Sequence, residues 1–178
     1  FDVAQHLGLQ TQPLLAQAGL SRALLLDPEQ RIPVDAAVRL LEESAAASGS
    51  FNFGLRMAES RQLSDFGSVS LLLTHQSTLR HALQALVHYR HLLNDALAII
   101  VEEAGRMVII REEVVTDHPM PARQATELAL GALFRLCSSL LGQHWHPLTV
   151  NFAYEAPDET QIYSRLFGCK LEFGSEFN

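Results

Sequence analysis

The sequence predicts an α+β domain with a mostly helical N-terminal half, followed by a small antiparallel or mixed sheet packed on a long helix. Three observations predict this architecture. Apolar residues recur at helical spacing through the first half of the chain. Two β-rich runs separated by Ala104-Gly105 then indicate a hairpin. The order that follows, long helix, strand, short helix and strand, favours a sheet made of the hairpin and two later strands over a doubly wound fold.

Length and composition are those of one folded domain. The chain has 178 residues, of which 48% are hydrophobic, and this is enough for a sizeable core. No apolar stretch approaches the roughly 20 residues that span a bilayer, so we expect no membrane contact. The opening FDVAQHLGL has neither a signal-peptide pattern nor an initial methionine, which indicates a fragment or a processed form. Cys137 and Cys169 fit buried thiols in a reducing cytoplasm.

The charge argues against direct contact between this segment and DNA. The formal net charge is −7, and the 13 lysines and arginines are scattered along the chain. Proteins that bind duplex DNA do so through basic patches that displace counterions. We therefore expect this segment to reach DNA only through another part of its parent protein.

The first fifty residues are predicted to form helical segments. Residues 2–9 and 11–19 show short runs of apolar periodicity. Three leucines then lead into Asp27-Pro28, which is a turn signal. A longer helix is expected over 33–48, because Pro33 suits its first turn and Gly49 follows its last periodic residue.

Three more helices are expected before the sheet. A short one covers 51–60. A second covers 67–75 and is apolar nearly all round, so we expect it to be buried. The clearest helical pattern begins after Ser77 or Thr78, either of which can cap it, and runs to Asn94 with leucines at helical spacing.

The second half of the chain alternates strands and helices. The hairpin strands are expected over 97–103 and 106–114. A long helix begins at Pro121 and is closed by Gly142. Its apolar residues cover more than one face, so it lies either inside the core or at a subunit interface. Residues 147–173 then read as a strand, a short helix and a last strand.

No pattern in the sequence indicates catalysis, a metal site or a cofactor. His88 and His91 can share one helix face, but the chain has no CxxC or HExxH motif to accompany them. It also lacks the GxSxG elbow of hydrolases and the GxGxxG and Walker loops of nucleotide sites. Adjacent acidic pairs such as Glu112-Glu113 point apart and are interpreted as solubilising groups.

Five polar residues on two helices form the predicted ligand site. His75 and Gln76 end the apolar helix, and the run His88, Tyr89 and Arg90 lies midway along the next helix. A small-molecule pocket combines apolar walls with a few oriented polar groups, and Arg90 could pair with a carboxylate. The alternative is that Tyr89 packs in the core while His88 and Arg90 face water.

Three stretches carry a resemblance to a known family and together cover nearly the whole chain. They read FGLRMAE, DFGSVSLLLTHQSTLRHALQALVHYRHLLND and VNFAYEAPDETQIYSRLFGCKLEFGSEFN. In order and spacing the chain resembles the N-terminal effector domain of AraC/XylS-type bacterial transcription regulators, the arabinose-binding type. The resemblance implies that Gly54 and Gly67 allow close helix packing around a sensor core. It also implies that the cap at Ser77-Thr78-Leu79 starts the helix that lines this core.

The resemblance implies a function as well. Residues 1–178 would form one effector-sensing and dimerisation domain, and a pair of helix-turn-helix motifs would follow Asn178. A small-molecule effector would shift the population of two arrangements of a homodimer and so change how the DNA-binding motifs are presented. No cofactor is implied. The alternative is a structural dimerisation module without a ligand, which the long apolar helix motivates. A small hydrolase or lyase rests only on the histidines.

Overall fold

The computed structural model describes residues 1–27, 30–142 and 144–178 and has the predicted α+β architecture. The expected turn at Asp27-Pro28 includes a proline outside the described residues. Among the described residues, no helix is both long enough and apolar enough to cross a membrane. The elements, in chain order, are α1 (Asp2–His6), α2 (Thr11–Gln17), α3 (Arg22–Leu26), α4 (Val34–Ser48), α5 (Phe53–Glu59), η1 (Leu63–Phe66), α6 (Ser68–Thr74), α7 (Leu79–Tyr89), η2 (Arg90–Leu92), β1 (Leu97–Ala104), β2 (Met107–Val114), α8 (Arg123–Leu141), β3 (Thr149–Phe152), α9 (Gln161–Phe167) and β4 (Lys170–Phe173).

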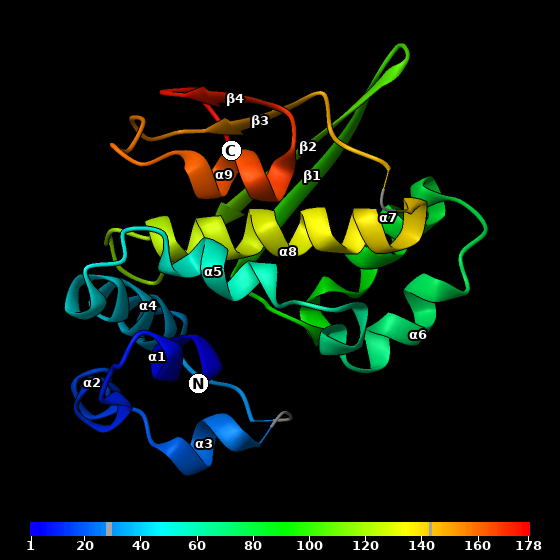
Figure 1. The fold of residues 1–178 in the computed structure, drawn as a ribbon. Helices are drawn as coiled ribbons and strands as arrows, with labels where there is room; N and C mark the ends of the chain where they lie inside the picture. Colours follow the sequence, from blue (N-terminus) through cyan, green and yellow to red (C-terminus); the bar gives the residue numbers. More distant parts are fainter. Residues whose placement is uncertain (28–29, 143) are drawn as a thin grey trace.

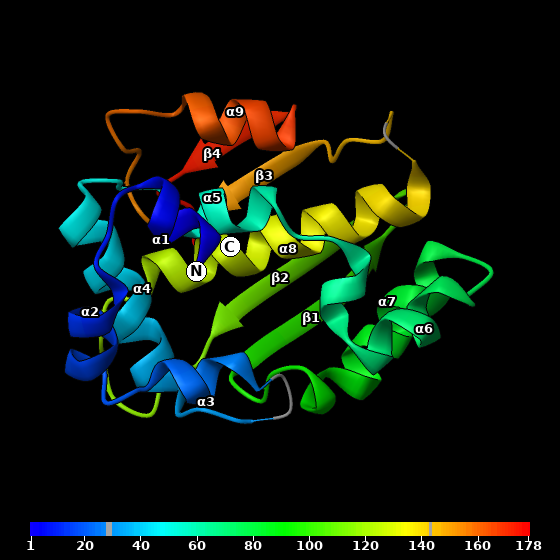
Figure 2. The same ribbon diagram turned by 60° about the horizontal axis from the view of Figure 1, so that its bottom comes forward.

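Helix α8 runs through the middle of the molecule (Figure 1). Helix α5 packs along it, and α4, α7, α9 and strand β2 contact it elsewhere. Figure 2 shows the β1–β2 hairpin beside α8, with α9 and the β3–β4 pair along another side. Leu130, Phe134, Leu136 and Cys137 of α8 are all buried. Of the two positions that its sequence allowed, α8 therefore takes the one inside the core, where the same chain covers its several apolar faces.

The strands pair as two separate two-stranded sheets. Strands β1 and β2 are antiparallel, as the hairpin signal predicted, with Ile99 opposite Glu112. Strands β3 and β4 are parallel, with Val150 opposite Leu171. Helix α9 connects them, because parallel neighbours need a crossover rather than a tight turn. The two later strands thus pair with each other, and the hairpin tip projects beyond the body of the molecule (Figure 1).

Aromatic side chains fill the space enclosed by α8, α9 and the β3–β4 pair. Phe152, Tyr163 and Phe167 are all buried. The Phe152 ring stacks on Phe173 with 5.0 Å between centroids and meets the Tyr163 ring edge-on at 5.2 Å. Such offset and edge-on contacts are the geometries that aromatic rings prefer. Tyr154 lies just beyond the end of β3 and packs against this cluster, so the aromatic core also orients the two tyrosine hydroxyls described below.

The segment around α6 corrects two expectations. The helix is not buried all round, since Leu71 is 65% exposed, while Val69 and Leu73 face the core. This short helix contacts α7 and η1, and its Leu71 and Leu72 side chains are exposed. A Cβ built on Gly67 meets nothing within 4 Å, so this glycine does not serve close packing. It is needed for its backbone, whose φ of 56° and ψ of −136° suit glycine.

Gly54 does serve close packing, as the resemblance implied. A Cβ at this position would lie 2.0 Å from the backbone carbonyl oxygen of Gln124. Further along the same pair of helices, a Cβ on Gly131 would lie 2.4 Å from the Cβ of Ala58. Helices α5 and α8 therefore approach each other at two points where a side chain is absent.

Candidate functional site

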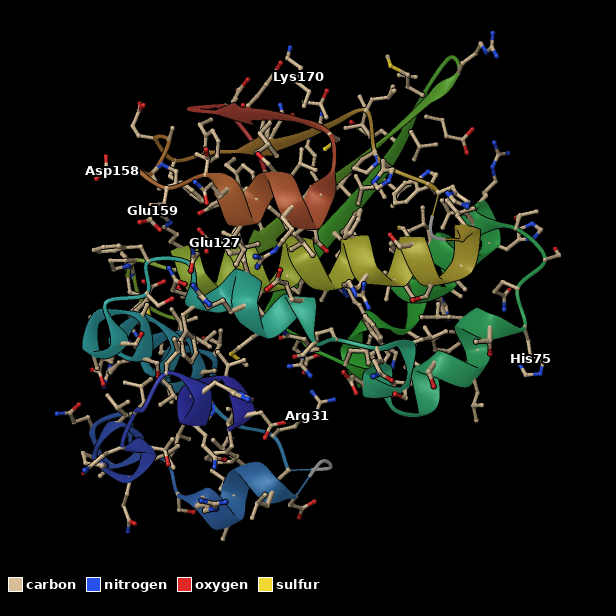
Figure 3. All side chains as sticks on the ribbon, in the orientation of Figure 1. Arg31, His75, Glu127, Asp158, Glu159 and Lys170 are labelled. Carbon is tan, nitrogen blue, oxygen red and sulfur yellow. The ribbon has the colours of Figure 1, made fainter. Side chains whose placement is uncertain are left out.

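A cavity of about 570 Å³ opens where four segments distant in the sequence meet. They are the end of α1, the α4–α5 loop with α5, the start of α8, and the β3–α9 loop. Small-molecule sites have volumes of roughly 300–1,000 Å³. In Figure 3, Asp158 and Glu159 lie at the same end of the molecule as Glu127. We call this space the Arg123 cavity, and its lining residues are Leu7, Ser48, Gly49, Ser50, Phe51, Asn52, Arg56, Arg123, Ala156, Pro157, Asp158 and Glu159.

A buried hydrogen-bond network lies behind Arg123. Glu127, one turn further along α8, is 0% exposed. Its Oε1 accepts hydrogen bonds from Arg123 Nε at 2.8 Å, from the Tyr154 hydroxyl at 2.8 Å and from the Tyr163 hydroxyl. Arg123 also donates to the Tyr163 hydroxyl at 2.8 Å, and its guanidinium carbon lies 4.6 Å from the Tyr154 ring centroid. The Arg123 side chain is therefore held between the cavity and the core.

The surroundings keep Arg123 and the two tyrosines of this network in defined protonation states. Burial, aided by the charge of Glu127, raises the pKa of Tyr163 to about 12. The same two causes raise the pKa of Tyr154. Partial burial acts to lower the pKa of Arg123, but its hydrogen bonds to Glu127 and Tyr163 outweigh this and raise it. Both tyrosines are thus neutral donors at physiological pH, so the network holds a cation in place rather than transferring protons.

Gln124 joins the wall of the cavity to three other elements. Its backbone N–H donates to Glu42 Oε1 of α4 at 2.7 Å, which satisfies one of the free donors in the first turn of α8. Its side-chain oxygen accepts from the Gly54 N–H at 2.9 Å, and its amide donates to the Phe51 carbonyl at 3.0 Å. The side chain is 2% exposed. The loop that carries Phe51 is therefore tied to α8 by a buried amide.

The five residues predicted to bind a ligand do not gather around one cavity. The side chains of His75 and Gln76, beyond the C-terminal end of α6, bond to backbone carbonyls of that helix at 2.7 and 2.8 Å. Tyr89 packs against the core, and Arg90 is exposed. The His88 ring lies edge-on to Tyr89 at 4.6 Å. Figure 3 shows His75 far from Glu127. A ligand site built from these five residues stays a prediction.

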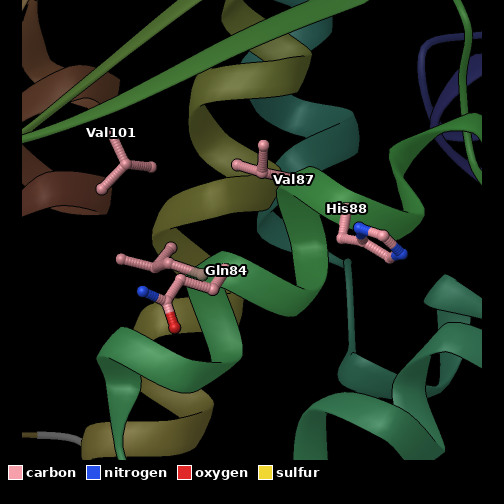
Figure 4. A pocket seen from close by; sticks show the side chains of 5 residues that line it. Gln84, Val87, His88 and Val101 are labelled. Carbon is pink, nitrogen blue, oxygen red and sulfur yellow. The ribbon is translucent and has the colours of Figure 1, made fainter.

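His88 does line a second, smaller cavity of about 330 Å³ between α7 and β1. We call it the α7–β1 cavity. Its other lining residues are Leu83, Gln84, Val87 and Val101. Figure 4 shows the His88 ring directed away from Val101. The polar groups that this cavity offers are one amide and one exposed imidazole, and both come from α7.

Glu112 is not a solubilising surface group, which corrects the interpretation of the Glu112-Glu113 pair. It lies on the inner face of the hairpin opposite Ile99 and is only 4% exposed. Its Oε2 has no hydrogen-bond partner in the described part of the chain. Burial raises the pKa of Glu112 to about 8. Alternation along β2 accounts for the difference, because Glu113 points to the opposite face and is exposed.

Replacing Glu112 by glutamine is expected to stabilise the protein more at pH 8.5 than at pH 5. Between its ordinary pKa near 4.5 and its folded pKa of about 8, the folded state binds more protons than the unfolded state, so stability falls as pH rises. Because one pKa unit corresponds to about 1.4 kcal/mol, the variant should gain about 2–4 kcal/mol over this range. Urea unfolding at both pH values measures the gain. The Glu113→Gln variant is the matched control. A stability gain in Glu112→Gln that does not depend on pH would contradict the raised pKa of a buried Glu112 carboxyl.

The sequence did not predict the network that Arg123, Glu127 and the two tyrosines form behind the cavity. One signal was available, since Arg123 and Glu127 stand at i and i+4 on the long apolar helix, where they can pair. Tyr154 and Tyr163 fall in the strand and the short helix predicted within 147–173, and nothing in their local pattern indicates a shared partner. Their hydroxyls meet Glu127 because β3 and α9 fold back on α8, which spacing along the chain does not predict.

The remaining chemistry-bearing side chains are dispersed or buried. Within the described ranges, no three His, Cys, Asp or Glu side chains stand where they could hold a metal ion together. Both cysteines are free thiols. Burial, with a contribution from the charge of Glu112, raises the pKa of Cys137 to about 12. A thiol in that state is a poor nucleophile.

Comparisons with known proteins agree in one family. The model of the "Arabinose-binding domain of AraC transcription regulator, N-term" matches residues 8–178. Two relatives named "HTH-type transcriptional regulator VirS", from Mycobacterium tuberculosis strains CDC 1551 / Oshkosh and ATCC 25618 / H37Rv, are each 25% identical over 176 residues. These matches cover 97% of this chain and 52% of each relative.

A solved structure has the same fold. The transcriptional regulator CdpR from Pseudomonas aeruginosa matches with a TM-score of 0.60 and 21% identity, over 97% of this chain and 52% of that one. At this identity the likeness shows the fold alone. The class of protein follows first from the sequence relatives, which are both named as transcriptional regulators. More particularly, the chain belongs to the family of arabinose-binding N-terminal domains of AraC transcription regulators. It spans about half the length of the relatives it matches.

Proposed function

We propose that this chain is the ligand-sensing domain of a cytoplasmic DNA-binding transcription regulator. A small metabolite binds in the Arg123 cavity and controls an appended helix-turn-helix domain. Two facts support this division into a sensing domain and a DNA-binding domain. The relatives are named HTH-type regulators, and this chain matches only 52% of their length. The formal net charge of −7 also fits a segment that reaches DNA only through another domain. In this proposal residues 1–178 form one sensing and dimerisation unit.

The observation that carries the proposal is how the Arg123 cavity is built. Its walls come from the N-terminal helices, from α8 and from the β3–α9 loop, so a ligand there contacts segments from both halves of the chain. Arg123 and Gln124 anchor these walls to the buried core. A ligand that binds one arrangement of the walls better than another shifts the population toward that arrangement.

A short chain of contacts leads from the cavity to the C-terminal residues. Arg123 lies over the Tyr154 ring, and the Tyr154 carbonyl accepts a hydrogen bond from the Gly174 N–H at 2.9 Å. Asn178 in turn accepts from the Ala153 N–H at 2.8 Å through its side chain, and from the Glu112 N–H at 3.2 Å through its backbone. We propose that a movement of Arg123 reaches an appended domain by this route.

Thermal unfolding against a panel of amino acids, polyamines, sugars and fatty acids tests the proposal. A specific ligand at 100 times its dissociation constant should add about 2.7 kcal/mol, which corresponds to a midpoint shift of roughly 5–10 °C. The shift should shrink in Phe51→Ala, which removes an exposed wall of the Arg123 cavity, and persist in His88→Ala. The reverse pattern would place the ligand in the α7–β1 cavity, near the site that the sequence predicted. No shift from any compound would contradict ligand sensing.

A structural dimerisation module without a ligand is the second candidate, and the hairpin favours it. Ile100, Met107 and Ile109 lie on its outer face and are 54%, 52% and 37% exposed. Large exposed apolar groups often mark association surfaces. We propose a homodimer under either function. Light scattering should give twice the chain mass, falling to the chain mass in Ile109→Lys, with Leu71→Lys on α6 as the control. A dimer without any ligand response would favour the structural module.

A further inference from the structure

We infer that the ligand of the Arg123 cavity carries both a cationic and an anionic group, as a small amino acid does. This inference rests on the proposed function and names the chemical class of its effector. It follows from the charged side chains that line the cavity. Some of them already form ion pairs within the protein, and others do not.

The positive side of the cavity is Arg56 on α5. Its Nε donates to the Asn52 side chain at 3.0 Å, which orients the guanidinium. Within the part of the chain that the structure describes, Arg56 forms no ion pair. The other guanidinium in the lining, Arg123, already has a carboxylate partner in Glu127. Arg56 is therefore the cation that remains available to a ligand carboxylate.

The negative side is the β3–α9 loop. Asp158 and Glu159 are both exposed and both line the cavity, and Figure 3 shows them above Glu127. Neither carboxylate forms an ion pair with any described residue. Arg56 and these two carboxylates thus face one space without reaching each other. A molecule that bridges them satisfies both signs of charge at once.

Some exposed charges elsewhere on this protein do find partners. Arg80 pairs with Glu103 at 2.8 Å, and Arg165 pairs with Glu59 at 2.7 Å. At the Arg123 cavity, unpaired charges of opposite sign line one space. Phe51 and Pro157 add apolar wall for the carbon skeleton of the ligand. A neutral sugar would leave the charges unpaired, and a fatty acid would place its chain beside two carboxylates.

The experiment compares four compound sets with the same carbon skeletons. They are amino acids, the corresponding acids without the amine, the corresponding amines without the carboxyl, and neutral polyols. Calorimetric titration of the protein should detect binding from the first set only. Arg56→Gln and the double variant Asp158→Asn/Glu159→Gln should each weaken binding by about tenfold or more, since each removes a charge-assisted contact. Arg39→Gln and Glu113→Gln are the matched controls and should leave the affinity unchanged.

Failure of the ligand class and failure of the proposed function give different results. If a singly charged or neutral compound set binds, and Phe51→Ala abolishes that binding, the inference of a zwitterionic ligand is wrong but ligand sensing remains in place. Binding of amino acids that the Arg56 and Asp158/Glu159 variants leave unchanged would also overturn the inference. The same calorimetry with a fractionated small-molecule extract of bacterial cells is the second arm. If no fraction and no compound set binds, both the inference and the proposed function are wrong.

Discussion

Replacing Glu127 by alanine is expected to lower the free energy of unfolding by about 3–5 kcal/mol, as breaking a buried ion pair does. Glu127 is 0% exposed, and its Oε1 accepts from Arg123 and from two tyrosine hydroxyls. Its removal leaves these three donors without their acceptor, and two of them are on core aromatic residues. The loss of the side chain also leaves a cavity beside α8.

Urea unfolding followed by circular dichroism measures this change, and the thermal midpoint should fall by roughly 6–20 °C for a chain of this length. Glu127→Gln keeps the shape and an acceptor oxygen, so it should cost less than Glu127→Ala. The control is Glu172→Gln, which breaks the exposed pair with Lys170 and should cost about 1 kcal/mol or less. A cost below about 1 kcal/mol for Glu127→Ala would mean that the network does not hold the fold together.

Replacing Gly54 by alanine is expected to cost about 3 kcal/mol or more, the upper range for overpacking a core. The added methyl would lie 2.0 Å from the Gln124 carbonyl oxygen, a backbone atom that cannot rotate away. Helix α5 must then move off α8. That movement also strains the hydrogen bond from the Gly54 N–H to the Gln124 side chain, which anchors the Phe51 loop.

Gly105→Ala in the hairpin turn is the matched control for this variant. It adds the same methyl where nothing lies within 4 Å, at a φ of 64°. Its expected cost is the backbone strain of a left-handed residue, about 1–2 kcal/mol. Equal costs at the two glycines, measured by urea unfolding, would contradict the close approach of α5 and α8. Because Gly54 and Gln124 support the Phe51 loop, the Gly54→Ala variant should also weaken ligand binding in the Arg123 cavity.

The network and the cavity have to be tested with different variants. Glu127 and Gln124 hold the walls of the cavity from behind, so their replacement changes stability and binding together. Phe51 and Arg56 lie on the exposed side of the walls, where replacement leaves the core intact. A change in affinity in those variants therefore reports on contacts with the ligand itself.

Much of this protein follows from its sequence. Hydrophobic periodicity predicted the helices and the hairpin, because repeats of 3.6 and 2 residues reflect which side chains face the core. Local signals predicted several helix ends, such as Gly49 in the left-handed conformation after α4 and the Thr78 hydroxyl that accepts from the His81 N–H at 3.2 Å. The order and spacing of three stretches were enough to indicate the family that the comparisons then showed.

The tertiary structure alone decided the rest. Periodicity states that a side chain faces inward, but not which distant residue it meets there. Glu127 meets Tyr154 and Tyr163 because β3 and α9 fold back over α8, and the Gln124 N–H is satisfied by Glu42 from another helix. The crossover through α9 paired β3 with β4, and the tertiary fold brought four segments together around the Arg123 cavity. Such contacts join residues far apart in the chain, and no local pattern of residue types encodes them.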